Sequence, residues 1–130
     1  MNKSEVLSAF NNHIGDFFTD VSMLFPDNND IKIAHTSLNA LRVANPRIII
    51  NIWKKNIVDI YKDKILEGNI DFFINKNYKS DLINHNSSNM ILDKIDTLRE
   101  PIRQMGEENQ KKTIQYLQNL TKICNLYYQD

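Results

Sequence analysis

The side chains best suited to nucleophilic or metal chemistry in this sequence are one cysteine and three histidines. Cys124 would act as a nucleophile only with a base such as His35 beside it, and its place on the apolar side of an expected helix instead predicts a small buried residue. His13, His35 and His85 lie in three different expected elements with no further histidine or cysteine at ligand spacing, so no zinc site is predicted. We expect His13 to be a structural or surface residue and His85 to be exposed.

Two pairs of carboxylates stand one helical turn apart, which is the spacing at which a metal ion or a proton can be shared. They are Asp59 with Asp63, and Asp93 with Asp96. Because each pair lies among basic residues on an expected solvent face, we predict ordinary salt bridges instead. The expected partners are Lys55, Lys62 and Lys94.

The residues at 27–30 (DNND) are similar to the start of a calcium-binding loop, in which oxygen ligands occupy alternate positions. The sixth position of such a loop needs glycine and the twelfth needs glutamate, but these places hold Lys32 and Leu38. Helix capping is therefore the predicted role of this run. The three glycines are widely separated and form no phosphate-binding loop, which disfavours a phosphoryl-transfer enzyme. Because the sequence shows no recognisable reactive constellation, we expect a protein that is not an enzyme, with no catalytic residue, cofactor or metal. The alternative is an enzyme that uses Cys124 and a histidine.

Large aromatic side chains gather on both sides of a chain break at Gly68. Such a cluster either locks helices together or presents an anchor to a partner, and aromatic anchors carry much of the binding energy of protein interfaces. The leading hypothesis is a non-enzymatic protein–protein interaction or structural module that binds a protein partner or itself. The interaction residues predicted on this basis are Tyr61, Phe72, Phe73 and Tyr78.

A basic face that binds nucleic acid is the alternative hypothesis, because lysines interleaved with aromatics can hold a strand by ion pairing and stacking. Acidic residues such as Asp59 and Asp63 occupy the same region and would repel phosphate. The whole chain has 16 basic and 16 acidic residues, and this balance also disfavours a nucleic-acid partner. The residues predicted to form such a face are Lys54, Lys55, Lys62, Lys76 and Lys79.

Length and composition indicate one folded domain that spans residues 1–130. The hydrophobic content of 42% and the charged content of 25% are typical of globular proteins. A single cysteine cannot form an internal disulfide, which indicates an intracellular, reducing compartment. Since the sequence shows neither a signal peptide nor an apolar run of about 20 residues, we expect no membrane span.

Apolar periodicity and helix-ending residues predict an all-α fold, a compact bundle of five to six helices. Proline at positions 26, 46 and 101 and glycine at positions 68 and 106 mark the expected boundaries. Ser4 is the expected N-cap of the first helix, and Gly68 with Asn69 is the expected left-handed cap of the third. The expected helices are residues 4–25, 27–43, 46–67, 88–102 and 107–128, with a short turn at 70–74 and a polar loop at 75–89.

The apolar faces of the first and third helices contribute to the expected core. Each face repeats at steps of three and four residues, as a helix with 3.6 residues per turn requires. Pro101 either kinks its helix or starts a new turn. The first helix is expected to bury Leu7, Phe10, Ile14, Phe17, Val21 and Leu24, and the third Ile49, Ile52, Trp53, Ile57, Ile60 and Tyr61.

Several short motifs follow one another along the chain: 25–27 (FPD), Trp53, Tyr61, 68–73 (GNIDFF), Tyr78, Asp81, 98–102 (LREPI), Tyr116 and Leu120. Their order resembles a group of small, largely uncharacterised helical proteins of nucleocytoplasmic large DNA viruses. The resemblance covers most of the chain and implies a minor virion or assembly component, placed in the virion or in the viral factory in the host cytoplasm. It implies no catalytic or ligand residue. Abundant Asn, Ile and Lys, which have AT-rich codons, agree with an AT-biased genome.

Overall fold

The first apolar stripe forms helix α1 (Lys3–Leu24) in the computed structural model, which describes residues 2–75 and 93–129. The helix begins two residues earlier than a Ser4 cap would allow. Its N-cap is Asn2, whose Oδ1 accepts a hydrogen bond from the backbone N–H of Glu5 at 2.8 Å. The prediction of a Ser4 cap is therefore wrong, whereas the expected end at Phe25, before proline, is confirmed.

Helix α2 (Asn29–Ala44) follows a short turn and packs back against α1. Asn28 is its N-cap, and the side-chain oxygen accepts a hydrogen bond from the N–H of Ile31 at 3.1 Å. The polar run at 27–30 therefore caps a helix, as predicted. Ile31, Ala34 and Leu38 are buried against the rest of the protein.

The third predicted helix is one continuous rod with a π-helical segment in its middle. It consists of α3 (Ile48–Trp53), η1 (Lys54–Val58) and α4 (Asp59–Leu66). In η1 the backbone N–H of Asp59 bonds to the carbonyl of Lys54, five residues earlier instead of four. Each such turn holds one residue more than an α-helical turn.

The extra residue in η1 changes which side chains of α4 face the core. An α-helix rotates by about 100° per residue, so one added residue turns the later apolar face by about that angle. Ile60 was expected in the core and is instead 53% exposed, which corrects the prediction. Its neighbour Tyr61 is only 7% exposed.

The rod ends at the predicted glycine cap. Gly68 has a φ of 80°, in the left-handed region that favours glycine. Its N–H bonds to the carbonyl of Ile65, and the N–H of Asn69 bonds to the carbonyl of Lys64, each at 3.0 Å. This pair of bonds is the Schellman arrangement, and the short helix α5 (Asp71–Asn75) follows it.

The C-terminal half begins with helical residues 93–96, followed by α7 (Arg99–Gln104) and α8 (Glu107–Tyr127). Pro101 lies in the first turn of α7, so it starts a new helix and does not kink a longer one. Except for Asn75, which ends α5, the predicted polar loop at 75–89 lies outside the described residues. So does the start of the helix expected from Ser88.

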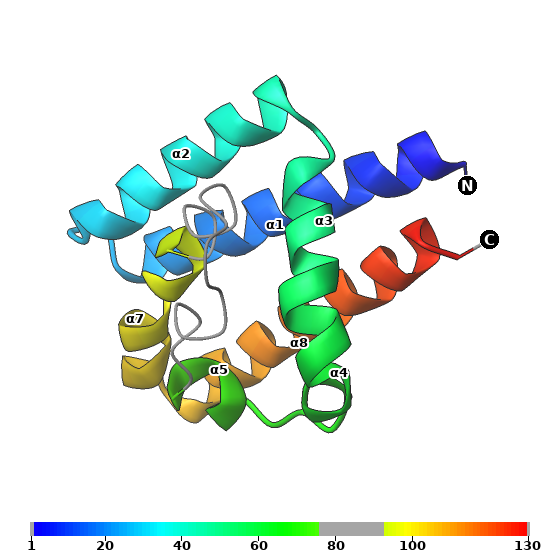
Figure 1. Cartoon of the computed structure of the whole chain (residues 1–130). Helices are drawn as coiled ribbons and strands as arrows, with labels where there is room; N and C mark the ends of the chain where they lie inside the picture. The colour runs from blue at the N-terminus through cyan, green and yellow to red at the C-terminus, as the bar shows by residue number, and fades with distance from the viewer. Residues whose placement is uncertain (1, 76–92, 130) are drawn as a thin grey trace.

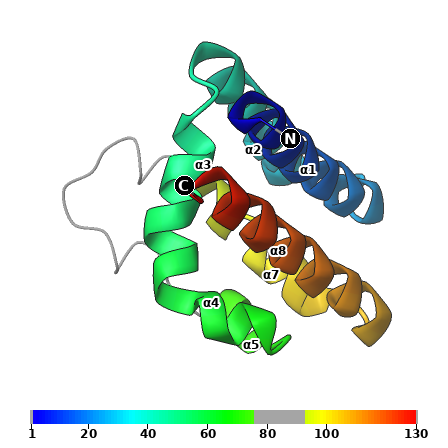
Figure 2. The same ribbon diagram turned by 90° about the vertical axis from the view of Figure 1, so that its right-hand side faces the viewer.

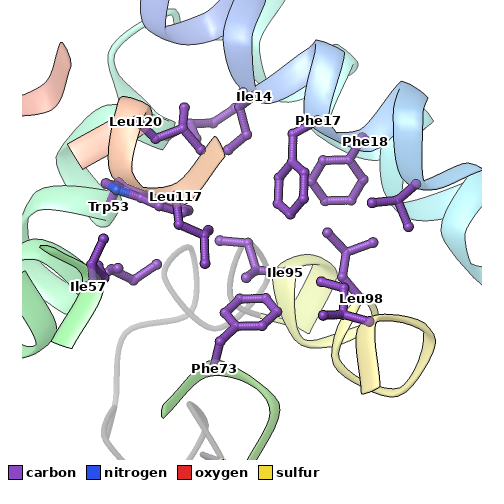
Figure 3. Close-up of a cluster of buried hydrophobic side chains, with 14 of the residues drawn as sticks. Ile14, Phe17, Phe18, Trp53, Ile57, Phe73, Ile95, Leu98, Leu117 and Leu120 are labelled. Atoms are coloured by element: carbon purple, nitrogen blue, oxygen red, sulfur yellow. The ribbon is translucent and has the colours of Figure 1, made fainter. Parts of the chain in front are cut away.

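The helices surround one core. The rod formed by α3, η1 and α4 crosses the pair formed by α1 and α8. Figure 1 shows α1 and α8 running in opposite directions, with the rod crossing in front of both, and Figure 2 shows the rod on one side of this pair of helices. No residue in the two described ranges forms a strand, so the predicted all-α bundle is confirmed. In these ranges no helix combines the length and the apolar character needed to cross a bilayer. Figure 3 shows the centre of the core, which includes Ile14, Phe17, Phe18, Trp53, Ile57, Phe73, Ile95, Leu98, Leu117 and Leu120.

Candidate functional site

The aromatic residues predicted to bind a partner are part of the core wherever the structure describes their side chains. Tyr61 is 7% exposed and Phe73 is 1% exposed. These two residues are therefore not surface anchors, and the prediction is corrected for them. The side chain of Phe72 and the whole of Tyr78 lie outside what the structure describes.

The segment that holds Phe73 is fixed to α7 by an arginine. Arg99 donates from Nε to the carbonyl of Phe73 at 3.1 Å and from Nη2 to that of Ile74 at 3.4 Å. Its Nη1 also contacts Asp96 at 2.7 Å. A cation beside the last carbonyls of a helix is favourable, because those carbonyls have no intrahelical donors. The segment after Gly68 therefore joins α5 to α7.

The lysines of the predicted nucleic-acid face are only partly described. Lys54 pairs with Asp59, and its Nζ lies 5.9 Å from the ring centroid of Tyr128. The pair spans five residues because η1 brings positions i and i+5 onto the same side of the rod. Lys55 and Lys62 are exposed. Lys76 and Lys79 lie outside the described residues.

The structure gives Asp59 and Asp96 partners other than those predicted. Asp59 binds Lys54, not Lys55 or Lys62, and Asp96 binds Arg99, not Lys94. Within residues 2–75 and 93–129 no group of three or more His, Cys, Asp and Glu side chains is placed to hold a metal ion.

Cys124 and the two described histidines are all engaged in packing. Cys124 is fully buried with its Sγ 3.9 Å from the carbonyl oxygen of Ile50, and burial raises the pKa of its thiol to about 12. The imidazole of His35 stacks on Phe18 at 5.9 Å between ring centroids. This arrangement matches the predicted role of Cys124 as a small apolar residue.

A surface hollow lies between the C-terminal half of α1 and the N-terminal half of α8. It is open to solvent and has a volume of about 400 Å³. Phe17 and Val21, each 2% exposed, form its apolar floor, while Met23 and Leu24 are 73% and 45% exposed at its edge. We call it the α1/α8 groove. Its lining residues are Phe17, Asp20, Val21, Met23, Leu24, Met105, Asn109, Lys112, Thr113 and Tyr116.

Tyr116 lies at one end of the groove and separates it from a second hollow. Its ring stacks on Phe17 with 5.2 Å between the ring centroids and lies tilted against His13 at 4.8 Å. Its hydroxyl donates a hydrogen bond to Asp20. Burial first, and then the neighbouring Asp20, raise the pKa of this phenol to about 12. On the far side of Tyr116 a second, more polar hollow of about 290 Å³ continues along the same two helices.

His13 lines this second hollow. Burial lowers the pKa of its imidazole, and the charge of Asp16 opposes the shift. The Nε2 atom of His13 is buried without a hydrogen-bond partner. His13 is therefore a structural residue, a neutral imidazole on α1 that packs against Tyr116 of α8, as the sequence indicated.

The two walls of the groove have opposite charge. Asp20 stands on the α1 wall and Lys112 on the α8 wall, and both residues line both hollows. One turn before Asp20, Asp16 is also exposed on α1. The groove therefore combines an apolar floor, an acidic edge and a basic edge.

The groove was hard to predict from the sequence because its two walls lie about 90 residues apart. One usable signal was the length of the apolar stripe on α1. That stripe continues to Leu24, which was expected in the core and is 45% exposed at the last turn of α1. An apolar stripe longer than its covering partners leaves an exposed apolar surface.

Scans against protein-family models, curated proteins and solved structures return no match for this chain.

Proposed function

We propose that this protein is a non-enzymatic helical protein–protein interaction module and that the α1/α8 groove is its docking surface. One observation carries the proposal. Met23 and Leu24 are 73% and 45% exposed at the edge of an open hollow whose floor is apolar. Exposed apolar surface gathered around a hollow is typical of binding sites, whereas single exposed apolar residues are common on any protein.

The chemistry of the described reactive groups supports binding over catalysis. The Cys124 thiol is fully buried and its pKa is raised to about 12, so the nucleophilic thiolate is disfavoured near neutral pH. Of the possible bases, His13 and His35 pack against aromatic rings. Each of these groups is explained by its part in the fold.

A place among the minor virion or assembly components of a large DNA virus is the cellular role we propose for this module. The resemblance in residues 25–27, 68–73 and 98–102 supports it, as does the AT-biased composition. Detection of the protein in purified viral particles would test this role. Its absence from particles and from viral factories would exclude it.

Site-specific photo-crosslinking tests the docking surface directly. A photoreactive amino acid at Met23 should form covalent protein adducts in cells that produce the protein. The same probe at Thr36, which is exposed on α2 and outside the groove, is the matched control. We expect adducts at Met23 and not at Thr36, and Leu24→Glu should reduce them. Equal labelling at both positions, or none at Met23, would reject the groove as a docking surface.

A further inference from the structure

We infer that the occupant of the α1/α8 groove is the same groove of a second copy of this chain, so that the protein forms a two-fold symmetric dimer. The inference rests on the proposed function and names the partner for its docking surface. In such a contact each copy presents the same patch, and the patch must complement itself. Both the apolar and the charged parts of this groove meet that requirement.

The apolar hollow of one copy and the exposed apolar side chains of the other can pack against each other. Each copy has one hollow with an apolar floor and, at its edge, two large exposed side chains, Met23 and Leu24. When two copies face each other, these side chains of one copy lie over the hollow of the other. Methionine suits this role because its flexible thioether side chain fills irregular spaces.

The charges select the orientation of the two copies. The acidic edge lies on α1 and the basic edge on α8, and these helices run in opposite directions side by side. A two-fold axis parallel to the groove places α1 of each copy over α8 of the other. Asp20 then faces Lys112 of the second copy, and this contact occurs twice. An axis across the groove would instead set acidic edge on acidic edge, which is repulsive.

The size of the face and the total charge also suit self-association. Helices α1 and α8 have 22 and 21 residues, so each is about 30 Å long. Two such helices side by side offer a face of the scale of the roughly 800 Å² per partner found in specific complexes. The formal net charge of the chain is zero, so two copies have no overall charge repulsion to overcome.

A charge exchange between two variants of the full chain tests the inference. Light scattering and sedimentation equilibrium should show a dimer for the unchanged protein. Asp20→Lys sets Lys against Lys112 at both contacts, and Lys112→Asp sets Asp against Asp20. Each variant alone should dissociate at least about tenfold more readily. Mixed in equal amounts, the two variants should form a heterodimer, because both contacts are then between opposite charges.

Two controls separate the interface from the fold. Lys112→Asp leaves the hydrogen bond between Tyr116 and Asp20 in place, and circular dichroism should show unchanged helicity for each variant. Met23→Glu should also produce monomers, while Thr36→Glu on α2 should not. A dimer that these groove variants do not weaken, or folded charge variants that fail to associate when mixed, would overturn the inference.

The same measurements distinguish this inference from the proposed function. An unchanged protein that stays monomeric up to submillimolar concentration, with crosslinks from Met23 to a different protein, would overturn the second-copy inference and leave the docking surface intact. A protein that stays monomeric and forms no crosslinks from Met23 would overturn both the second-copy inference and the proposed docking surface. Crosslinked adducts of twice the mass of the chain, found only with the probe in the groove, are the result that supports both.

Discussion

The phenolic hydroxyl of Tyr116 on α8 donates a hydrogen bond to the carboxylate of Asp20 on α1, across 96 residues of sequence. This contact joins the two walls of the α1/α8 groove. The ring of Tyr116 also stacks on Phe17 in the groove floor. One side chain thus holds the spacing of the two helices and separates the apolar hollow from the polar one.

Replacing Tyr116 by Phe should keep the ring stacking and remove the hydrogen bond. We expect a loss of about 0.5–1 kcal/mol in the free energy of unfolding, measured by urea denaturation. The phenol pKa is raised from 10 to about 12, so the folded state holds this proton more tightly than the unfolded state does. The stabilisation is therefore complete below pH 10 and is lost as the pH rises towards about 12. In an absorbance titration Tyr116→Phe should lack one late-ionising phenol, and an unchanged titration would contradict the assignment.

The two described histidines predict a loss of stability in mild acid. Burial lowers the pKa of His13, opposed by Asp16, and burial together with the charge of Arg42 lowers that of His35. The unfolded chain takes up protons near the ordinary value of 6.5, before the folded chain does, so the free energy of unfolding falls as the pH drops below that value.

Thermal melts from slightly alkaline to mildly acidic pH should show this decline in the unchanged protein. His13→Asn cannot take up the proton and should reduce the slope of melting temperature against pH. A slope that is the same in both proteins would show that His13 does not contribute.

Gly68→Ala should destabilise the protein by about 1 kcal/mol, because its φ of 80° disfavours any residue with a Cβ atom. Space is not the obstacle, since the nearest atom to an added Cβ would be Gln118 Nε2 at 3.8 Å. Gly106→Ser is the matched control. Gly106 has a φ of −68° and no atom within 4 Å of an added Cβ, so serine should be accepted as the N-cap of α8. Equal losses for the two variants, measured by denaturation, would contradict this reading of the Gly68 cap.

The thiol of Cys124 should be unreactive in the folded protein. It is fully buried and its pKa is raised to about 12, so both access and the thiolate form are lacking. A thiol reagent such as iodoacetamide should modify it in urea and not in native buffer, as judged by mass spectrometry. Fast modification under native conditions would show that α8 opens readily from the rod.

Phe73→Ala should cost about 3–5 kcal/mol of stability, the usual loss for a buried phenylalanine. Phe73→Leu keeps most of the apolar volume and should cost less than about 1.5 kcal/mol. Chemical denaturation of both variants checks the difference. Losses near zero for Phe73→Ala would mean that the side chain does not lock α5 to the core.

The helices could be predicted because their signals are local. Apolar spacing, the amide at Asn28 and the glycine at position 68 act within one or two turns of the chain, and each has the predicted effect. The N-cap of α1 was misplaced because Asn2 and Ser4 are both good capping residues, and only the position of the first turn chooses between them.

The candidate site could not be predicted in the same way. Its walls come from opposite ends of the chain, and the antiparallel contact of α1 and α8 is a tertiary choice that no local pattern encodes. Tyr61 and Phe73 were predicted as interaction residues and are buried. An aromatic residue near a polar segment has the same sequence pattern whether it is buried or exposed, so the pattern alone does not predict its burial. Periodicity identifies an apolar face, and only packing determines whether that face is covered.

The π-helical segment at Lys54–Val58 amounts to one residue inserted into an otherwise regular helix. The apolar residues before this segment and those after it follow the same helical repeat, but the second set is shifted by one residue relative to the first. A relative without this insertion would have one residue fewer here, and an ungapped alignment would pair every core position of α4 with a solvent position. Searches for distant relatives of this chain should therefore allow a single-residue gap between positions 54 and 58.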